Sequence, residues 1–159
     1  MRTVRRTVPA PEGLGTEVVG VPAGSDLELD LRLEAVMEGV LVSGKVRGTA
    51  AGECVRCLDA VTVDVDVDLM DLFAYPDREA EDVDDDVREL DGDYIVLEDA
   101  VRDAVVPALP FQPVCRDDCP GLCSECGARL ADDPGHVHES LDPRWAALQG
   151  ILQDDEKES

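Results

Sequence analysis

The chain has 159 residues, the length of one ordinary domain with room for a small appendage. Lys and Arg number 14 against 37 Asp and Glu, so the formal net charge is −23. This excess argues against direct strong binding to nucleic acid or to an anionic membrane, because both attract clustered cations. The hydrophobic fraction of 44% allows a core, and the aromatic fraction of 3% predicts that Val, Leu and Ala fill it.

The first residues, MRTVRRTVPAPEGLG, are basic, but no apolar stretch follows them, which differs from the pattern of a signal peptide. No run approaches the ~20 apolar residues that a transmembrane helix needs. We therefore expect a cytoplasmic protein. Because thiols stay reduced in the cytosol, the six cysteines suggest metal binding in preference to disulfides.

Residues 26–72 carry a period-two pattern that predicts three antiparallel strands. Leucines occupy alternate positions over 27–33, with charged residues between them. A turn at 37–39 leads into a second strand that ends near residue 50. Hydrophobic and polar residues alternate again over 61–69, which predicts the third strand. Together they predict an antiparallel, curved sheet with one apolar face.

After the sheet, the segment 76–93 is acidic and poor in apolar residues, so we expect a loop there. A short strand is expected at 94–97. A helix is expected over 98–106, where acidic residues come early and an apolar stripe follows. Pro107 and Pro110 are expected to end it.

The predicted fold class is α+β: an antiparallel curved sheet, a helix, a metal-clipped Cys-rich segment and a short C-terminal helix. Four parts are expected along the chain. Residues 1–25, rich in Pro and Gly, form an irregular lead-in, and 26–110 form the α+β core. Residues 111–140 form a Cys- and His-rich zinc segment. Residues 141–159 form a C-terminal helix and tail, because Asp142 suits the N-cap of a helix and Pro143 suits its first position.

Two Cys-x-x-Cys motifs have the spacing of zinc knuckles, in which two thiolates reach one ion. They are Cys54-Val55-Arg56-Cys57 and Cys123-Ser124-Glu125-Cys126, and Gly127 after the second can take a positive φ. The remaining candidate ligands are Cys115, Cys119, His136 and His138. A buried, inert role suits a lone cysteine, and a redox pair is more typical of a thioredoxin-like helix start.

Eight ligands suit one or two structural zinc ions, and a closed set of four leaves no open position for catalysis. The favoured partition is Cys54, Cys57, Cys115 and Cys119 for one ion and Cys123, Cys126, His136 and His138 for the other. A second joins Cys54 and Cys57 to Cys123 and Cys126. A third uses only Cys115, Cys119, Cys123 and Cys126. Sequence spacing does not choose among them.

Asp64, Asp66 and Asp68 are predicted to form an acidic row on the outward face of the third strand. Lys45 and Arg47 are expected to lie opposite the acids of the first strand. The row is either a solvated face or a docking stripe for a basic partner. The chain carries none of the common catalytic motifs of hydrolases, P-loop enzymes, zincins or dinucleotide-binding enzymes, so we expect no enzyme.

The order of several motifs is informative. They are Glu53-Cys54-Val55-Arg56-Cys57-Leu58, Ala108-Leu109-Pro110, Pro113-Val114-Cys115, Cys119-Pro120-Gly121-Leu122-Cys123-Ser124-Glu125-Cys126-Gly127 and Asp142-Pro143-Arg144-Trp145-Ala146-Ala147-Leu148. This set, over roughly residues 26–150, resembles the YceD family of large ribosomal RNA subunit accumulation proteins. The Arg- and Asp-rich composition suggests an actinobacterial member. Many family members have Cys-x-Cys where this chain has His136-Val137-His138.

The resemblance implies a role in accumulation of 23S ribosomal RNA and assembly of the large subunit, with no enzymatic activity. Because the chain is so acidic, we expect an adaptor that is stabilised by zinc and binds a basic ribosomal protein or an rRNA-processing factor. The alternative is a zinc- or thiol-dependent enzyme, either a nuclease or a redox factor.

Overall fold

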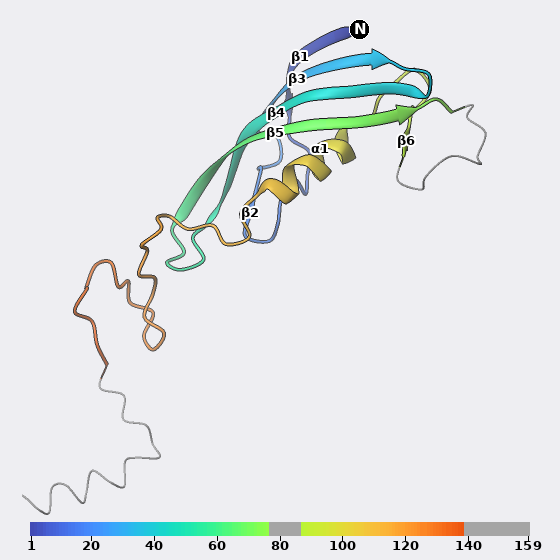
Figure 1. Cartoon of the computed structure of the whole chain (residues 1–159). Helices are drawn as coiled ribbons and strands as arrows, with labels where there is room; N and C mark the ends of the chain where they lie inside the picture. Colours follow the sequence, from blue (N-terminus) through green and yellow to red (C-terminus); the bar gives the residue numbers. More distant parts are fainter. Residues whose placement is uncertain (77–86, 139–159) are drawn as a thin grey trace, which may run out of the picture. The chain divides into compact units, whose positions relative to one another are not determined.

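The structure, a computed structural model, describes residues 1–76 and 87–138 (Figure 1). The chain divides into two compact units, Met1–Cys119 and Pro120–Ser159. The expected C-terminal helix and tail at 141–159 lie outside the described residues, as does most of the expected acidic loop. In the described part of the chain, no helix is long and apolar enough to cross a membrane.

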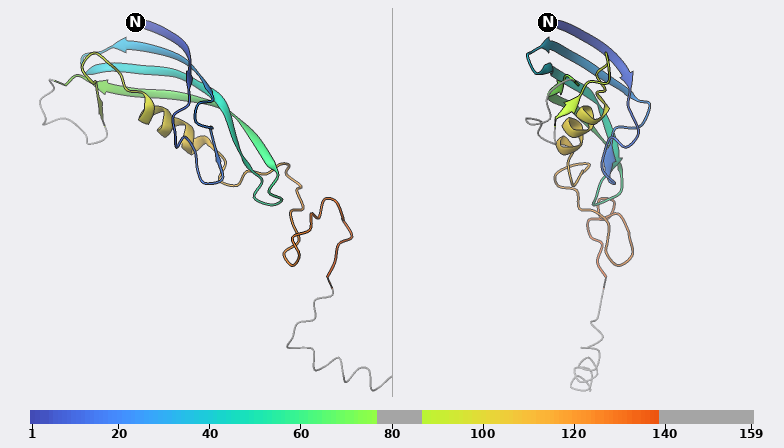
Figure 2. Two further views of the ribbon diagram at one scale, coloured as in Figure 1. Left: turned by 180° about the vertical axis from the view of Figure 1, so that it is seen from behind. Right: turned by 90° about the vertical axis from the view of Figure 1, so that its right-hand side faces the viewer.

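The first unit is built on one sheet with the strand order β1-β3-β4-β5-β6, and β2 pairs with β4. The strands are β1 (Arg2–Pro9), β2 (Val19–Gly20), β3 (Asp26–Ala35), β4 (Gly39–Glu53), β5 (Ala60–Ala74) and β6 (Arg88–Glu89). Neighbours are antiparallel, except for the parallel pair β5 and β6. The long strands β4 and β5 pair along their whole length and bend together (Figure 2). The expected antiparallel curved sheet is confirmed.

Alternation along the strands places the hydrophobic side chains on one face of the sheet. Leu31 of β3, Val46 of β4 and Leu69 of β5 are each at most 2% exposed. The helix α1 (Glu98–Val105) lies against this face and contributes Val105, which is fully buried. Each such side chain contributes about 1.5–3 kcal/mol on burial, so this layer carries much of the stability of the first unit.

The helix expected over 98–106 is confirmed, with a different ending. Glu98 and Asp99 occupy its first turn, where negative charge interacts favourably with the helix dipole and stabilises the helix. A 3-10 turn, η1 (Val106–Ala108), follows directly, and Pro107 lies inside it. Pro107 cannot supply a backbone N–H, which explains why the α-helical pattern stops just before it.

The prediction that residues 1–25 are irregular is wrong. Strand β1 pairs with β3 over all eight of its residues. Farther along, Leu14 and Val19 are each 2% exposed and belong to the core. The prediction took the prolines as a sign of irregular chain. Pro9 is the last residue of an edge strand, however, and a missing backbone N–H costs little there.

The predicted strand at 94–97 is also wrong. The structure has only an isolated bridge there, between Asp91 and Tyr94. Ile95 and Leu97 nevertheless pack against the core while the residues beside them are exposed. A short segment that lies on a core can alternate in burial without pairing to a neighbouring strand, which accounts for the error.

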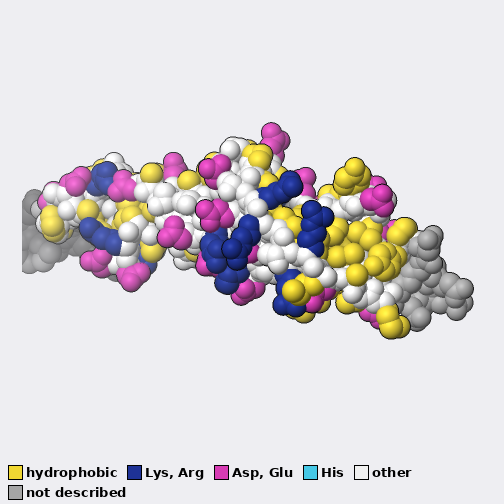
Figure 3. Space-filling view, turned by 90° about the horizontal axis from the view of Figure 1, so that it is seen from above, with side chains coloured by type: hydrophobic (Ala, Val, Ile, Leu, Met, Phe, Trp, Pro, Cys, Tyr) yellow, Lys and Arg dark blue, Asp and Glu magenta, His cyan; other side chains and the backbone are white. Residues whose placement is uncertain are grey.

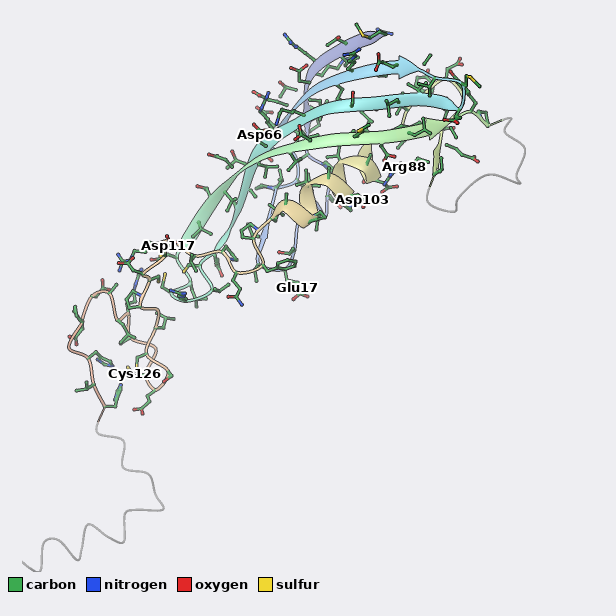
Figure 4. All side chains as sticks on the ribbon, in the orientation of Figure 1. Glu17, Asp66, Arg88, Asp103, Asp117 and Cys126 are labelled. Carbon is green, nitrogen blue, oxygen red and sulfur yellow. The ribbon has the colours of Figure 1, made fainter. Side chains whose placement is uncertain are left out.

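Strand β6 falls within the segment that was expected to be a loop, 76–93. Its Arg88 forms ion pairs with Asp71 of β5 and Asp103 of α1. The side chains of Arg88 and Asp71 are 25% and 23% exposed, so this contact is partly shielded from water. Figure 4 shows Arg88 and Asp103 close together beside α1, where they tie the helix to the end of the sheet.

Candidate metal centres

The first cysteine knuckle forms the turn between β4 and β5. The backbone N–H of Cys54 donates to the carbonyl of Asp59 over 2.7 Å, and the N–H of Leu58 donates to the carbonyl of Cys54 over 2.8 Å. These two hydrogen bonds form a tight turn that directs the side chains of Cys54 and Cys57 toward the same site. Leu58, just after the second cysteine, has a φ of 63°.

The second half of this site comes from the segment after η1. The N–H of Val55 donates to the carbonyl of Pro113 over 2.9 Å, which docks the segment on the knuckle. The Nη1 atom of Arg56 donates to the carbonyls of Asp117, at 3.0 Å, and Cys119, at 3.2 Å. These bonds carry Cys115 and Cys119 to the knuckle, although sequence reasoning gave Arg56 no role.

Four sulfur atoms meet at this point. The Sγ atoms of Cys54 and Cys119 are 3.9 Å apart, and those of Cys57 and Cys115 are 3.6 Å apart. All four lie within 4.8 Å of one another. Tetrahedral zinc with bonds of about 2.3 Å places its sulfur ligands about 3.8 Å apart, so the donor set fits this ion. Cys54 is fully buried, and it packs with Val61 beside the site.

Electrostatics in this cluster also favour a cation. Burial raises the pKa of the Cys54 thiol, but backbone N–H groups, that of Cys115 foremost, donate to its sulfur and lower the pKa to about 6. For Cys57 the N–H of Asp59 lowers the pKa, yet burial and the surrounding thiols outweigh it and raise the pKa to about 12. Sulfur atoms this close cannot all ionise unless a cation joins them.

The second knuckle, in the second unit, repeats the hydrogen bonds of the first. The N–H of Cys123 donates to the carbonyl of Ala128 over 2.8 Å, and the N–H of Gly127 donates to the carbonyl of Cys123 over 2.9 Å. The φ of Gly127 is 72°. The N–H groups of Cys126 and Glu125 donate to the Cys123 sulfur and lower its pKa to about 6.

Two histidines complete this second group. The Nε2 atoms of His136 and His138 each lie 3.2 Å from the Sγ of Cys126, and they lie 2.9 Å from each other. These atoms and the Sγ of Cys123 are all within 4.8 Å of one another. Each ring thus turns the same nitrogen toward the sulfurs, which fits a cation held by two thiolates and two imidazoles.

The outer nitrogens of both histidines face carboxylates. The Nδ1 atom of His136 lies 3.6 Å from Asp133, and that of His138 lies 3.5 Å from Glu125. Ligating histidines usually turn their second nitrogen to such an acceptor, which orients the ring and fixes its tautomer. Sequence reasoning missed Asp133 and Glu125, because in so acidic a chain their positions next to ligands are not distinctive.

The two groups differ in their surroundings. The first belongs to the unit that contains the hydrophobic core, and Cys57 and Cys119 are 8% and 5% exposed. Among the described residues of the second unit, 120–138, no hydrophobic side chain is buried. Its order rests on turns and on the convergence of its four ligands.

The structure therefore brings the eight candidate ligands together as in the first of the three partitions. One group is Cys54, Cys57, Cys115 and Cys119, and the other is Cys123, Cys126, His136 and His138. That metal occupies either group stays a prediction, and the donor chemistry and the spacing of both groups fit it.

The acidic row lies on the face of the sheet that α1 leaves open, but it is not free of cations. Lys45 contacts Asp66 at 2.9 Å and Asp68 at 3.3 Å, and Arg47 contacts Asp66 at 3.2 Å. These contacts raise the pKa of Lys45 and lower that of Asp66. Among the described residues, Asp64 is the member of the row that forms no ion pair.

Lys45 and Arg47 were expected to lie opposite the acids of β3, where a favourable charge pairing could form. The register does place Lys45 beside Asp30 and Arg47 beside Glu28. Their ion pairs nevertheless go to β5, on the other side of β4, so this part of the prediction is corrected. Figure 3 shows the result on this face, where Lys and Arg lie among Asp and Glu, and hydrophobic side chains gather toward the β3–β4 turn.

These features define a small acidic α+β protein with two Cys/His groups suited to tetrahedral metal ions. The family model for the large ribosomal RNA subunit accumulation protein YceD matches residues 42–152. The chain belongs to the YceD family, whose description implies a role in accumulation of the large-subunit ribosomal RNA.

The relatives found are mycobacterial. An uncharacterised protein of Mycobacterium tuberculosis is 49% identical over 148 residues, which cover 92% of this chain and 72% of the relative. An uncharacterised protein of Mycobacterium leprae is 46% identical over 154 residues, covering 96% of this chain and 71% of the relative. These relatives agree with the expected actinobacterial membership. No solved structure matches the chain.

Proposed function

We propose that this chain promotes accumulation of 23S ribosomal RNA in the cytoplasm as a non-enzymatic adaptor for the assembly of the large subunit. Its membership of the YceD family is the observation that carries the proposal. A net charge of −23 makes direct binding to RNA unfavourable. The proposed adaptor therefore acts through a basic protein, either a ribosomal protein or an rRNA-processing factor.

Structural zinc is the proposed cofactor, with one ion for each group of ligands. Thiolate and imidazole donors in sets of four favour zinc over magnesium or calcium, which prefer oxygen. Four protein ligands fill a tetrahedral shell, so the ion would fasten the chain and leave no open position for a substrate. In the first group it would join the β4–β5 turn to the segment after η1.

The acidic row contributes to this proposal mainly at long range. Lys45 and Arg47 compensate Asp66 and part of Asp68, so the row offers less free charge than its sequence suggests. The excess of negative charge on the chain as a whole still attracts a basic partner and speeds encounter. We propose that Asp64, Asp66 and Asp68 add to this attraction while close docking occurs elsewhere.

Depletion of the protein in its own organism tests the function. The ratio of 23S to 16S ribosomal RNA is expected to fall, and the full chain is expected to restore it. An unchanged ratio would contradict the role in rRNA accumulation. The adaptor part is tested separately with purified protein and protein-free 23S RNA at physiological salt, where no binding is expected; measurable binding would contradict it.

Native mass spectrometry tests the cofactor. The full chain is expected to carry two zinc ions, and Cys54→Ser and Cys123→Ser are each expected to lose one. Cys54 and Cys123 are matched, because each is the first cysteine of its knuckle. A chain in which both ligand groups are ordered without metal would contradict this part of the proposal.

A further inference from the structure

A cleft of about 350 Å³ lies between the loop that begins at Thr16 and the first cysteine knuckle. The loop and β2 form one wall. Cys54, Val55 and Leu58 of the knuckle form the other, and the last residues of β4 lie between the two walls. All of these residues belong to the first unit, and the row of Asp64, Asp66 and Asp68 takes no part in the cleft.

Three hydrophobic side chains line this cleft and remain exposed. Val18 is 39% exposed, Val55 is 42% exposed and Leu58 is 60% exposed. Leu58 stands out because its φ of 63° is a conformation that suits glycine or asparagine and costs energy for leucine. A large apolar side chain held at a strained position and turned to solvent points to a function other than packing.

Carboxylates from both sides accompany these side chains. Glu17 projects from the loop before β2 (Figure 4), and Glu53 ends β4. Both are exposed, and neither forms an ion pair with a described cation. The guanidinium of nearby Arg56 is directed to the carbonyls of Asp117 and Cys119. The cleft therefore combines apolar surface with negative charge that the fold itself leaves uncompensated.

We propose that this cleft docks a segment of a basic large-subunit ribosomal protein in which an apolar side chain is flanked by Lys or Arg. The apolar side chain fills the space between Val18, Val55 and Leu58, and the flanking cations pair with Glu17 and Glu53. The inference rests on the proposed function for the existence of a basic partner. It assigns close docking to the cleft and only long-range attraction to the acidic row.

An array of overlapping peptides from the large-subunit ribosomal proteins of the same organism provides the probe for the full, metal-loaded chain. Retained peptides are expected to contain an apolar residue between basic residues. In the best peptide, replacing that residue by Ser is expected to weaken binding about tenfold, the loss that follows when one apolar side chain is no longer buried. Amides of the cleft are expected to shift in NMR spectra when the peptide binds.

Two pairs of variants separate the cleft from the outward face of the sheet. Leu58→Asn keeps the backbone conformation accessible and is expected to weaken the peptide about tenfold, whereas Met70→Asn, at an outward position 77% exposed, leaves it unchanged. Glu17→Gln with Glu53→Gln is expected to weaken binding about threefold to tenfold at low salt, whereas Asp64→Asn, which removes only long-range attraction, is expected to weaken it less than about twofold.

Failure to retain any peptide would overturn the docking proposal, and so would equal losses in the cleft variants and the outward-face variants. Neither outcome touches the rRNA measurement in depleted cells, so failure of the cleft and failure of the proposed function are distinguishable. Thermal unfolding of each variant verifies that a loss of binding does not come from a loss of folding.

Discussion

Leu58 and Gly127 occupy the same place in two separate knuckles: each follows the second cysteine of a Cys-x-x-Cys motif and adopts a positive φ, of 63° and 72°. Each also donates its backbone N–H to the carbonyl of the first cysteine four residues back, over 2.8 and 2.9 Å. The turn therefore requires the left-handed conformation at this position whichever residue stands there. Glycine meets the requirement without strain, and leucine does not.

Replacing Gly127 by Ala tests this requirement in the second knuckle. A Cβ atom there would meet nothing within 4 Å, so the expected cost, about 1–2 kcal/mol, comes from the backbone alone. Metal affinity of the second group should fall about tenfold, measured by competition with a chromophoric chelator. Gly135→Ala is the matched control, because its Cβ would meet only the Asp133 carboxylate at 3.7 Å. Equal effects of the two substitutions would contradict the argument.

Removal of metal is expected to affect the two units unequally. In NMR spectra, a strong chelator should shift the amides of 120–138 to random-coil values, because no hydrophobic side chain is buried among these residues. Amides at the centre of β4, near Val42 and Val46, should stay protected, because the core there is independent of the ligands. Cys123→Ser should shift the amides of 120–138 in the same way and leave those of the first unit unchanged. Loss of the whole sheet on chelation would show that the core does not stand without metal.

Metal binding at the first group is expected to release protons at neutral pH. The pKa of Cys57 is raised to about 12 and that of Cys115 is also raised, so both are thiols before an ion binds and thiolates afterwards. Cys54, with a pKa of about 6, is already ionised. Affinity should therefore rise with pH above neutrality and fall as the pH drops through about 6, where Cys54 takes up its proton.

Calorimetry checks the proton release, because the heat of zinc binding then depends on the ionisation enthalpy of the buffer. The measurement uses Cys123→Ser, in which the second group is disabled and the first remains. Heat that is the same in every buffer would contradict the prediction.

Arg88 is expected to contribute to stability through Asp71 and Asp103, which lie on β5 and α1. Arg88→Gln leaves the partly shielded Asp71 without its cation and should cost about 1–3 kcal/mol in urea unfolding. Arg102→Gln is the control, because Arg102 pairs with the exposed acids Glu98 and Asp99 within one helix and should cost less than about 1 kcal/mol. A larger loss of stability in Arg102→Gln than in Arg88→Gln would contradict the proposed role of Arg88 in linking helix and sheet.

Strict alternation made β3, β4 and β5 predictable, because every second residue must enter one core. The same reasoning failed for β1, where Val4 and Val8 are half-buried and arginines lie between them. An edge strand faces the core weakly, so its hydrophobic pattern is correspondingly weak. Strand β6 has two residues, too few for any period to appear.

At the metal centres, ligand type and spacing were enough to name all eight candidate residues. They did not determine the grouping, because Cys57 and Cys115 are separated by 58 residues and meet only through the fold. The docking of Val55 on Pro113 and the bonds of Arg56 to backbone carbonyls bring them together. Backbone contacts of this kind carry no signature in a sequence.

The separation of these ligands also has a consequence in time. A ribosome makes the chain from its N-terminus, so Cys115 and Cys119 emerge 58 and 65 residues after the sulfurs that they face. During that interval the nascent sheet presents half of a ligand set to the cell. A product truncated anywhere before Cys119 can never close it, which makes occupancy of the first group a chemical mark of completed synthesis of this unit.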